Sequence, residues 1–268
     1  RDILSNINPL PPNALDHLTE LGFSLENLLN KLELVPISGE FKYSYQNILF
    51  SVIKLIIEKI TGVSYEECLK QRILEPLCMT QSCLNQQEYE QCQKRTRPHL
   101  FKDGKISELP GSNLFFTTQP ATGMCMSIRD LGIWLSYCQR NHDVLLKEIF
   151  TPLPYADPPY AMGWWQADKQ GLVKCHDGSA IGYESHMAIV PSRGYGIAVL
   201  TNTSNSGFGR KVINHFVRVV TSLYDFDMFT LFYCRSLERP AISLDSIQGR
   251  YFNIFLEKEL VLKNKPTH

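Results

Sequence analysis

Residues 41–62 read FKYSYQNILFSVIKLIIEKITG, and the fold prediction rests on this stretch. Between residues 46 and 60, apolar side chains occur almost all the way around a helical projection. Such a distribution predicts a helix that is buried on most of its sides. Gly62 ends the pattern, as glycine commonly does after the last residue of a helix. Tyr45 stands at the start of the predicted helix.

Shorter helices are predicted on either side of this segment. Ser24 precedes regularly spaced leucines, and Ser64-Tyr65-Glu66-Glu67 has the S-x-x-E spacing of a capping box. The second of these helices must end near Glu75 because a proline follows. Residues 127–138 repeat the capping spacing ahead of an apolar stripe. Residues 80–120 are polar and rich in Pro and Gly, which predicts a long irregular excursion.

A change of pattern after Pro159 predicts a β-sheet. Short β-rich runs with brief turns between them follow at residues 163–167, 172–177, 184–190 and 195–201. Connections this short join antiparallel neighbours only. Residues 210–224 return to helical spacing, which predicts a last helix packed on that sheet. The predicted fold class is α/β (α+β), an antiparallel β-sheet flanked by helices plus a largely helical subdomain.

The composition of the chain excludes some partners. The 268 residues contain 27 Lys and Arg against 27 Asp and Glu, so the formal net charge is zero. A nucleic-acid partner is not expected because it would require an excess of positive charge.

No run reaches the roughly 18 apolar residues of a transmembrane segment. No histidine or cysteine spacing points to a metal site, and no cofactor is predicted. The oligomeric state stays open.

Three short motifs could carry chemistry, although each is weak alone. Tyr45-Gln46-Asn47 stands at the mouth of the long helix, His176-Asp177-Gly178-Ser179 ends a strand, and Ser51-Val52-Ile53-Lys54 spells S-x-x-K. A tyrosine before a buried helix more often serves in packing. A histidine before Asp-Gly more often marks a turn. The segments that flank these motifs decide between the two interpretations.

The order of the flanking segments resembles that of the penicillin-recognising serine hydrolases. This family comprises class C β-lactamases, low-molecular-weight penicillin-binding proteins, and related esterases and D-amino-acid peptidases. The similar segments span nearly the whole chain, at residues 1–5, 41–47, 56–62, 124–135, 163–165, 176–179, 182–186 and 198–202. The resemblance implies a β-lactamase/transpeptidase-like fold and hydrolysis through an acyl-enzyme.

The resemblance also implies a role for each site residue. Acyl transfer needs a nucleophile, a proton acceptor and N–H donors aimed at the oxyanion. Tyr45 would transfer the proton, with its pKa lowered by nearby cations. Asn47 would hold the substrate amide or the lysine of the nucleophile motif. His176 would replace the lysine of the family's K-T-G motif. Gly178 and the backbone N–H of Ser179 would complete the oxyanion site.

The family's S-x-x-K motif precedes the segment that residues 1–5 resemble, so the nucleophile is expected upstream of this chain. Ser51 and Lys54 form the only S-x-x-K present. At 100° per residue Ser51 turns away from the helix mouth, and it is not expected to meet Tyr45. Two alternatives stay open. The chain is part of an active hydrolase, or it is a catalytically dead pseudoenzyme or binding module of the same fold.

Substrate and domain limits follow from the same resemblance. The substrate would be a small-molecule ester, peptide or β-lactam-like amide. Histidine at position 176 removes a permanent cation, which ranks esters and D-amino-acid peptides above β-lactams. Residues 1–228 would form the hydrolase domain without its N-terminal part. Residues 229–268 would be a C-terminal extension similar to the start of a small β module. Most relatives are exported to the periplasm, although no export signal is visible here.

Overall fold

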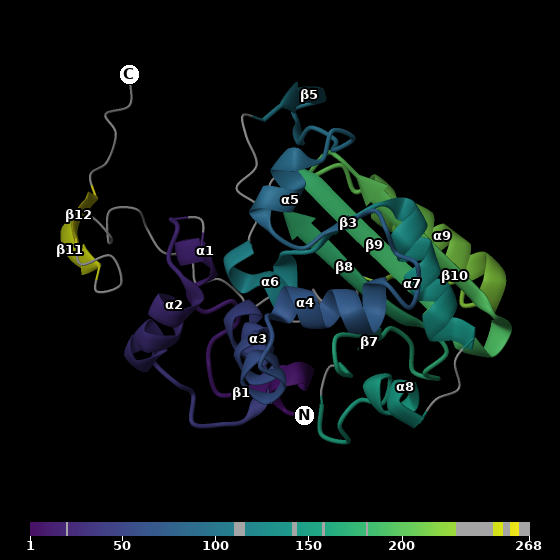
Figure 1. The fold of residues 1–268 in the computed structure, drawn as a ribbon, viewed down its shortest axis with the longest axis horizontal. Helices are drawn as coiled ribbons and strands as arrows, with labels where there is room; N and C mark the ends of the chain where they lie inside the picture. Colours follow the sequence, from purple (N-terminus) through teal and green to yellow (C-terminus); the bar gives the residue numbers. More distant parts are fainter. Residues whose placement is uncertain are drawn as a thin grey trace.

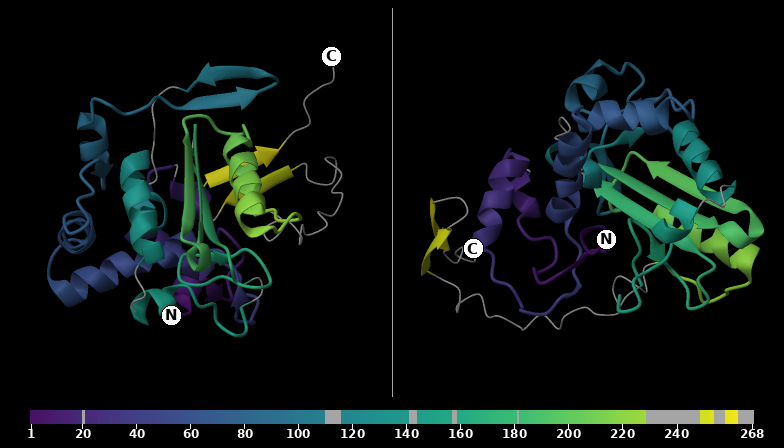
Figure 2. Two further views of the ribbon diagram at one scale, coloured as in Figure 1. Left: turned by 90° about the vertical axis from the view of Figure 1, so that its right-hand side faces the viewer. Right: turned by 60° about the horizontal axis from the view of Figure 1, so that its bottom comes forward.

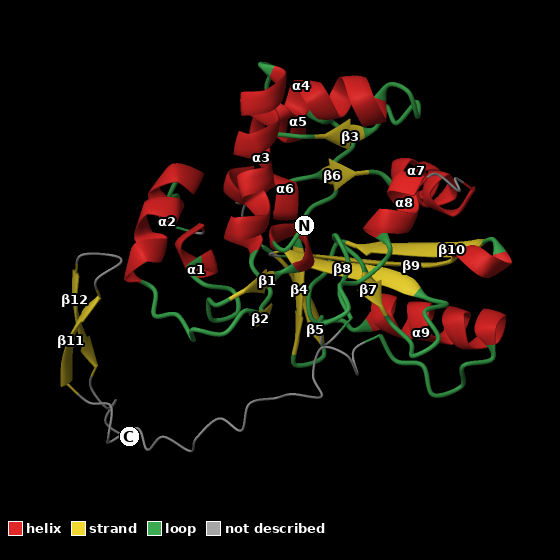
Figure 3. Cartoon of the chain, turned by 90° about the horizontal axis from the view of Figure 1, so that it is seen from below, coloured by secondary structure: helices red, strands yellow, loops and turns green. Residues whose placement is uncertain are grey.

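The computed structural model describes residues 1–19, 21–109, 116–140, 144–156, 159–180, 182–228, 249–253 and 258–262. A four-stranded antiparallel sheet with the order β10-β9-β8-β7 forms its centre (Figure 1). The strands are β7 (Trp165–Gln166), β8 (Lys174–Ala180), β9 (Tyr183–Val190) and β10 (Tyr195–Thr201). Helix α7 (Ile128–Arg140) covers one face of the sheet and α9 (Phe208–Thr221) the other (Figure 3). The predicted antiparallel sheet with a last helix packed on it is confirmed.

The described ranges contain further helices and single helical turns. The other helices are α1 (Asp16–Thr19), α2 (Leu25–Lys31), α3 (Asn47–Thr61), α4 (Tyr65–Leu69), α5 (Gln86–Gln91), α6 (Gln119–Thr122) and α8 (Val144–Ile149). Short 3₁₀-helical turns are η1 (Ile3–Ser5), η2 (Leu32–Leu34), η4 (Phe116–Thr118) and η5 (Pro191–Arg193), and η3 (Lys70–Leu74) is a turn of π-helix.

Within the described ranges, four further strand pairs form separate two-stranded sheets. They join β1 (Ile7–Asn8) to β2 (Lys42–Tyr43), β3 (Ser82–Cys83) to β6 (Cys125–Met126), β4 (His99–Lys102) to β5 (Lys105–Glu108), and β11 (Gly249–Asn253) to β12 (Lys258–Leu262). The β4-β5 hairpin extends beyond the central sheet (Figure 2). None of the helices in the described ranges combines the length and hydropathy needed to cross a bilayer.

The serine caps predicted from the sequence are formed. Ser24, Ser64 and Ser127 each accept a hydrogen bond from the backbone N–H three residues later, at 3.2, 3.1 and 3.2 Å. These bonds satisfy donors at the beginnings of α2, α4 and α7 that have no partner within the helix. Gly62 follows α3 with a φ of 72°, in the left-handed region that glycine tolerates.

The burial of α3 differs from the prediction. Only Ile48 and Ser51 of this helix are buried, whereas Leu55, Ile56 and Ile60 are 44%, 40% and 78% exposed. The helix packs against α2, α4 and α6. The apolar residues that face away from these three helices have no covering layer among the described residues. The sequence pattern shows which faces of a helix are apolar, but it does not show which of these faces another element will cover.

Two predicted boundaries also change. The excursion at residues 80–120 contains α5 and the β4-β5 hairpin, and its residues 110–115 lie outside the described ranges. Strand β8 continues through the His176-Asp177-Gly178-Ser179 motif, because Gly178 and Ser179 pair with Ser185 and Glu184 of β9. The motif therefore lies within a strand. Of the C-terminal extension, residues 229–248 lie outside the described part, and β11 and β12 form a two-stranded hairpin.

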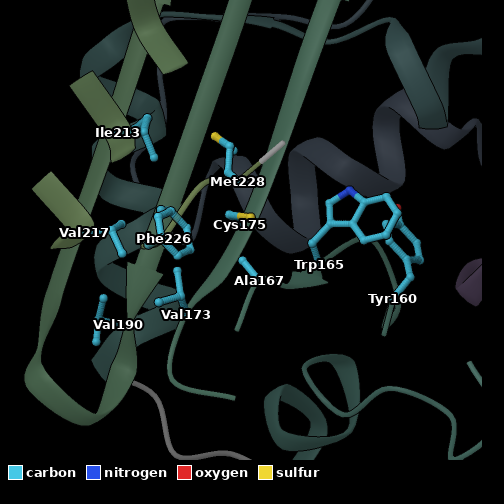
Figure 4. Packing of buried hydrophobic residues seen from close by; sticks show 11 residues of the cluster. Tyr160, Trp165, Ala167, Val173, Cys175, Val190, Ile213, Val217, Phe226 and Met228 are labelled. Atoms are coloured by element: carbon cyan, nitrogen blue, oxygen red, sulfur yellow. The ribbon is translucent and has the colours of Figure 1, made fainter. Parts of the chain in front are cut away.

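The main hydrophobic core lies between the sheet and α9 (Figure 4). Its buried members are Tyr160, Trp165, Ala167, Val173, Cys175, Ala188, Val190, Ile213, Val217, Phe226 and Met228. Cys175 of β8 belongs to this core. Because successive side chains of a strand point to opposite faces, His176 points to the other face of the sheet. The strand therefore contributes to the core and presents a polar side chain on its other face.

Two valines on α9 test the energetic role of this core. Val217 is fully buried, whereas Val219 on the same helix is 66% exposed. Val217→Ala removes two buried methyl groups, so we expect a loss of about 2 kcal/mol in the free energy of unfolding, measured by urea denaturation. Val219→Ala is the matched control and should change it by less than about 0.5 kcal/mol. Equal effects of the two substitutions would contradict the assigned core.

Candidate active site

A cleft between α3, α6 and the sheet brings together three of the predicted site residues. It has a volume of about 150 Å³ and is lined by Asn6, Tyr45, Gln46, Asn47, Phe50, Pro120, Ala121, Tyr160, Gly163, His176 and Met187. Tyr45, Asn47 and His176 thus share one cleft, although they come from distant segments of the chain. Gly178 and Ser179 lie further along β8 and are not among the lining residues.

The Tyr45 segment is held by pairing with the start of the chain. Ile7 of β1 pairs with Tyr43 of β2. Asn6 has a φ of 55°, a conformation that asparagine tolerates better than most residues, and its side-chain oxygen accepts the Gln46 N–H at 2.9 Å. Helix α3 begins directly after Gln46, with Asn47 at its first position. The short β1-β2 pair therefore sets the position of the Y-x-N motif.

Tyr160 links the two predicted catalytic residues. Its ring lies edge-on to Tyr45 with centroids 6.1 Å apart, and the rings of Tyr45 and His176 are 6.3 Å apart. The Tyr160 hydroxyl lies 3.2 Å from Nε2 of His176. Burial raises the pKa of Tyr160 well above its usual value, so this hydroxyl stays protonated and can donate. The direction of this contact depends on the tautomer of His176: the hydroxyl donates to Nε2 when the imidazole proton is on Nδ1, and accepts from Nε2 when it is there.

Burial keeps His176 in the neutral form. Loss of hydration lowers the pKa of its imidazole, and the adjacent Asp177 opposes this effect only in part. Tyr45 is also kept neutral, since burial and the charges of Asp177 and Asp16 raise the pKa of its hydroxyl. The proton-transfer role that the family resemblance implies for Tyr45 requires a cation that lowers this pKa. No Lys or Arg lines the cleft within the described residues, so that cation is not among them.

Asn47 has a partner that the sequence analysis missed. Its side-chain nitrogen donates to Oδ2 of Asp16 at 2.7 Å. Burial raises the pKa of Asp16, while the hydrogen bond from Asn47 and the nearby His17 lower it. The second carboxylate oxygen of Asp16 is buried without a hydrogen-bond partner among the described residues. Nothing in the sequence around Asp16 distinguishes it from the other acidic residues of the chain.

The S-x-x-K sequence inside α3 serves the fold. Ser51 is fully buried and donates to the backbone oxygen of Asn47 at 2.6 Å. Lys54 binds Glu66 at 3.0 Å and the side-chain oxygen of Gln119 at 2.9 Å. Neither residue lines the cleft. The geometry agrees with the prediction that Ser51 does not meet Tyr45.

Metal binding finds no support in the described ranges. No three His, Cys, Asp or Glu side chains there are grouped so that they could hold a metal ion. The cleft offers phenol, imidazole and amide groups, which suit hydrogen bonding and proton transfer.

Residues 8–222 match the family described as Beta-lactamase. The chain belongs to this family. The relative "Protein flp" of Staphylococcus aureus (strain NCTC 8325 / PS 47) is 29% identical over an alignment of 187 residues, and the match covers 66% of this chain and 36% of that protein. The chain thus spans about a third of the length of this curated relative.

Two solved structures show the β-lactamase/transpeptidase-like fold. The octameric penicillin-binding protein homologue from Pyrococcus abyssi matches with a TM-score of 0.66 and 20% identity, over 98% of this chain and 63% of that chain. The D-amino acid amidase from Ochrobactrum anthropi SV3, complexed with L-phenylalanine amide, matches with a TM-score of 0.64 and 18% identity. That match covers 83% of this chain and 70% of the amidase. The fold class predicted from the sequence is confirmed.

The titration of His176 tests the polarity of the cleft. Because burial lowers the pKa of His176, we expect its imidazole to be protonated at a lower pH in the folded protein than in the urea-unfolded chain, where histidine titrates near 6.5. Between these two values the unfolded chain binds more protons, so this group contributes to a loss of stability as the pH falls below about 6.5. The imidazole NMR signal, assigned with His176→Gln, measures both midpoints. A folded midpoint at or above the unfolded one would contradict the described burial.

Proposed function

We propose that the protein is a serine hydrolase that acts through an acyl-enzyme, with the serine and lysine of an S-x-x-K motif supplied by residues outside the 268 given. The observation that carries this proposal is the shared cleft of Tyr45, Asn47 and His176. The Ser51 and Lys54 side chains are engaged elsewhere, and no serine lines the cleft within the described residues. The family membership of residues 8–222 supports the same reaction class.

Each residue of the cleft has a proposed part in the reaction. Tyr45 would take the proton of the serine hydroxyl as it attacks the acyl group, and would return it to the leaving group. This role requires a cation beside the phenol, because burial and two carboxylates now oppose its ionisation. The lysine of the S-x-x-K motif would provide that charge. His176, oriented by Tyr160, would hydrogen-bond Tyr45 or the substrate, and Asn47 would hold a polar group of the substrate.

The oxyanion would be bound at β8. Strand β7 pairs only with Lys174 and Cys175, so the outer edge of β8 from His176 onward has no strand partner within the described ranges. An edge strand leaves alternate backbone N–H groups available to a ligand. The Ser179 N–H is the proposed donor, and Gly178 precedes it on this strand. At Gly178 a Cβ would lie 2.6 Å from the hydroxyl oxygen of Ser185 on β9, so that hydroxyl would have to turn away to admit a larger residue.

A catalytically dead pseudoenzyme or binding module of the same fold is the alternative. The lack of a serine among the lining residues of the described cleft favours it. In either case the ligand would be a small-molecule ester, peptide or β-lactam-like amide. We also propose that residues 1–228 form the family domain and that residues 229–268 are a C-terminal extension.

Covalent labelling of the protein expressed from its complete open reading frame distinguishes the two functions. A fluorophosphonate or a penicillin should add covalently to one serine, detected by mass spectrometry. Tyr45→Phe should slow this acylation by about 10²–10⁴-fold, because the proton acceptor is lost. Tyr43→Phe is the matched control. It also removes a phenolic oxygen, but Tyr43 is not among the residues that line the cleft, so the acylation rate should change by less than about threefold. No adduct with an intact upstream serine would favour the binding module.

Substrate preference gives a second test. β-Lactams carry a carboxylate, and no Lys or Arg among the described residues lines the cleft to bind it. We therefore expect kcat/KM for a short-chain aryl ester to exceed that for nitrocefin by at least about tenfold, which corresponds to roughly 1.4 kcal/mol. Absorbance assays of both substrates measure the ratio. Equal or faster turnover of nitrocefin would contradict this ranking.

A further inference from the structure

Three cysteines from separate segments of the chain form a thiol cluster outside the cleft. Cys83 is the last residue of β3 and pairs directly with Cys125, the first residue of β6. Cys92 follows directly after α5, which packs against β3. All three are free thiols and half-buried, and none of them lines the cleft. The proposed function gives these three residues no part.

The pairing of β3 with β6 brings two of the thiols within the span of a disulfide. Directly opposite residues of antiparallel strands have Cα atoms about 4.5 or about 5.5 Å apart, depending on their place in the hydrogen-bond pattern. Disulfides join Cα atoms that are about 4.4–6.8 Å apart, so both values fall within this range. Directly opposite side chains also lie on the same face of a sheet. The backbone therefore allows a disulfide between Cys83 and Cys125.

Cys92 is held near this pair by the junction between β3 and α5. The side chain of Asn85 accepts the Glu88 N–H at 2.9 Å, and Oε2 of Glu88 accepts the Leu84 N–H at 2.8 Å. These bonds fix the start of α5 to the end of β3. The ionisation of the thiols agrees with a close approach, because burial raises the pKa of Cys83 and the neighbouring Cys92 raises it further. Cys83 is therefore close to two other thiols.

The chemistry open to the thiol cluster is exchange among its sulfur atoms. In the described part of the chain, no three His, Cys, Asp or Glu side chains are grouped to hold a metal ion. Burial, and then the thiols of Cys83 and Cys92, raise the pKa of Cys125 to about 12. Each thiol thus disfavours the ionisation of the next, and a disulfide removes two ionisable groups at once. Neighbouring thiols exchange by attack of one thiolate on a disulfide sulfur.

We propose that Cys83, Cys92 and Cys125 form a thiol–disulfide exchange site, at which a small-molecule disulfide such as glutathione disulfide oxidises Cys83 together with one of its two neighbours. A thiolate of the cluster attacks one sulfur of the reagent, forms a mixed disulfide and displaces one half of the reagent. A second protein thiolate attacks the protein sulfur of the mixed disulfide and displaces the other half. Two protein thiols are oxidised to one disulfide, the S–S bond of the reagent is reduced to two thiols, and the two protons pass to the displaced thiolates.

The thiol cluster adjoins one wall of the cleft. The backbone oxygen of Leu84, directly after Cys83, accepts a hydrogen bond from Nε2 of Gln119. Gln119 is buried and begins α6, and the next two residues of that helix line the cleft. Cys125 follows the same helix at the start of β6. A disulfide at Cys83 would therefore restrict the motion of α6 and of the cleft wall that it forms.

Oxidation of the protein expressed from its complete open reading frame tests the exchange site. After incubation with glutathione disulfide, peptide mapping by mass spectrometry should show Cys83 bridged to Cys92 or to Cys125. Cys83→Ser should abolish the internal disulfide, whereas Cys92→Ser and Cys125→Ser should each retain one, because Cys83 keeps a thiol neighbour. Cys78→Ser is the matched control, since Cys78 is an exposed thiol outside the cluster, and it should leave the yield of the disulfide unchanged.

Thermal unfolding in the presence of reductant verifies that the variants fold, and Cys83→Ala repeats the test with an apolar side chain. For the wild type, oxidation should raise the melting temperature by about 4 °C or more, because the disulfide restricts the unfolded chain. Neither Cys83 variant should show this rise.

Hydrogen exchange tests the connection to the cleft. The backbone amides of residues 119–126 should exchange at least about threefold more slowly in the oxidised wild type than in the reduced wild type, because the disulfide opposes local opening. Cys83→Ser treated with glutathione disulfide should exchange like the reduced protein.

Three outcomes would overturn the inference. Recovery of unreacted thiols or of a mixed disulfide alone would show that no second thiol of the cluster lies within reach. An internal disulfide that persists in both Cys83 variants would remove Cys83 from the site. Unchanged hydrogen exchange in the bridged protein would overturn the restriction of α6. None of these measurements requires turnover, so the labelling experiment decides the hydrolase function independently.

Discussion

The buried phenol of Tyr160 connects the hydrophobic core to the cleft. Its ring packs edge-on against Trp165 with centroids 4.7 Å apart, and only 1% of the residue is exposed. Its hydroxyl lies 3.2 Å from Nε2 of His176. A close-packed side chain of this kind cannot shift without disturbing its neighbours. The cleft is therefore positioned by the core itself and not by surface loops.

The two-residue period of β8 completes this arrangement. Cys175 is fully buried in the core under α9, and the next residue, His176, reaches the cleft on the opposite face. A shift of the strand by one residue would exchange these two environments. The register with β9 and the packing of the core therefore also determine the orientation of the imidazole. Stability and site geometry depend on the same strand pairing.

Much of the fold could be predicted from the sequence because it depends on local patterns. Alternating runs with short turns indicated the antiparallel sheet. The capping-box spacing, S-x-x-E at Ser64 and S-x-x-D at Ser127, indicated two helix starts that the structure contains. The prediction that α3 is buried on most sides was wrong, because Ile60 is covered by no other element among the described residues. The apolar pattern of a helix does not reveal which of its faces will find a partner.

The site was predicted only in part, and for a different reason. Tyr45, Asn47 and His176 came from the order of segments shared with a known family, and the structure places them around one cleft. Asp16 and Tyr160 were missed because their roles exist only through contacts with residues distant in the chain, Asn47 and His176. No spacing rule relates such positions. Convergence of this kind becomes visible only when the fold brings the segments together.

The electrostatic state of the cleft is the last constraint on its chemistry. Burial keeps both the Tyr45 phenol and the His176 imidazole neutral, so the ionisation of Tyr45 that the proposed proton transfer needs is disfavoured. A single ammonium group beside Tyr45 would favour the phenolate, since opposite charges interact strongly where water is excluded. Such a group would act at the same place whether it belonged to a lysine of the protein or to a ligand. The proposed reaction would therefore need one positive charge beside Tyr45 in addition to the serine nucleophile, which is not among the residues that line the described cleft.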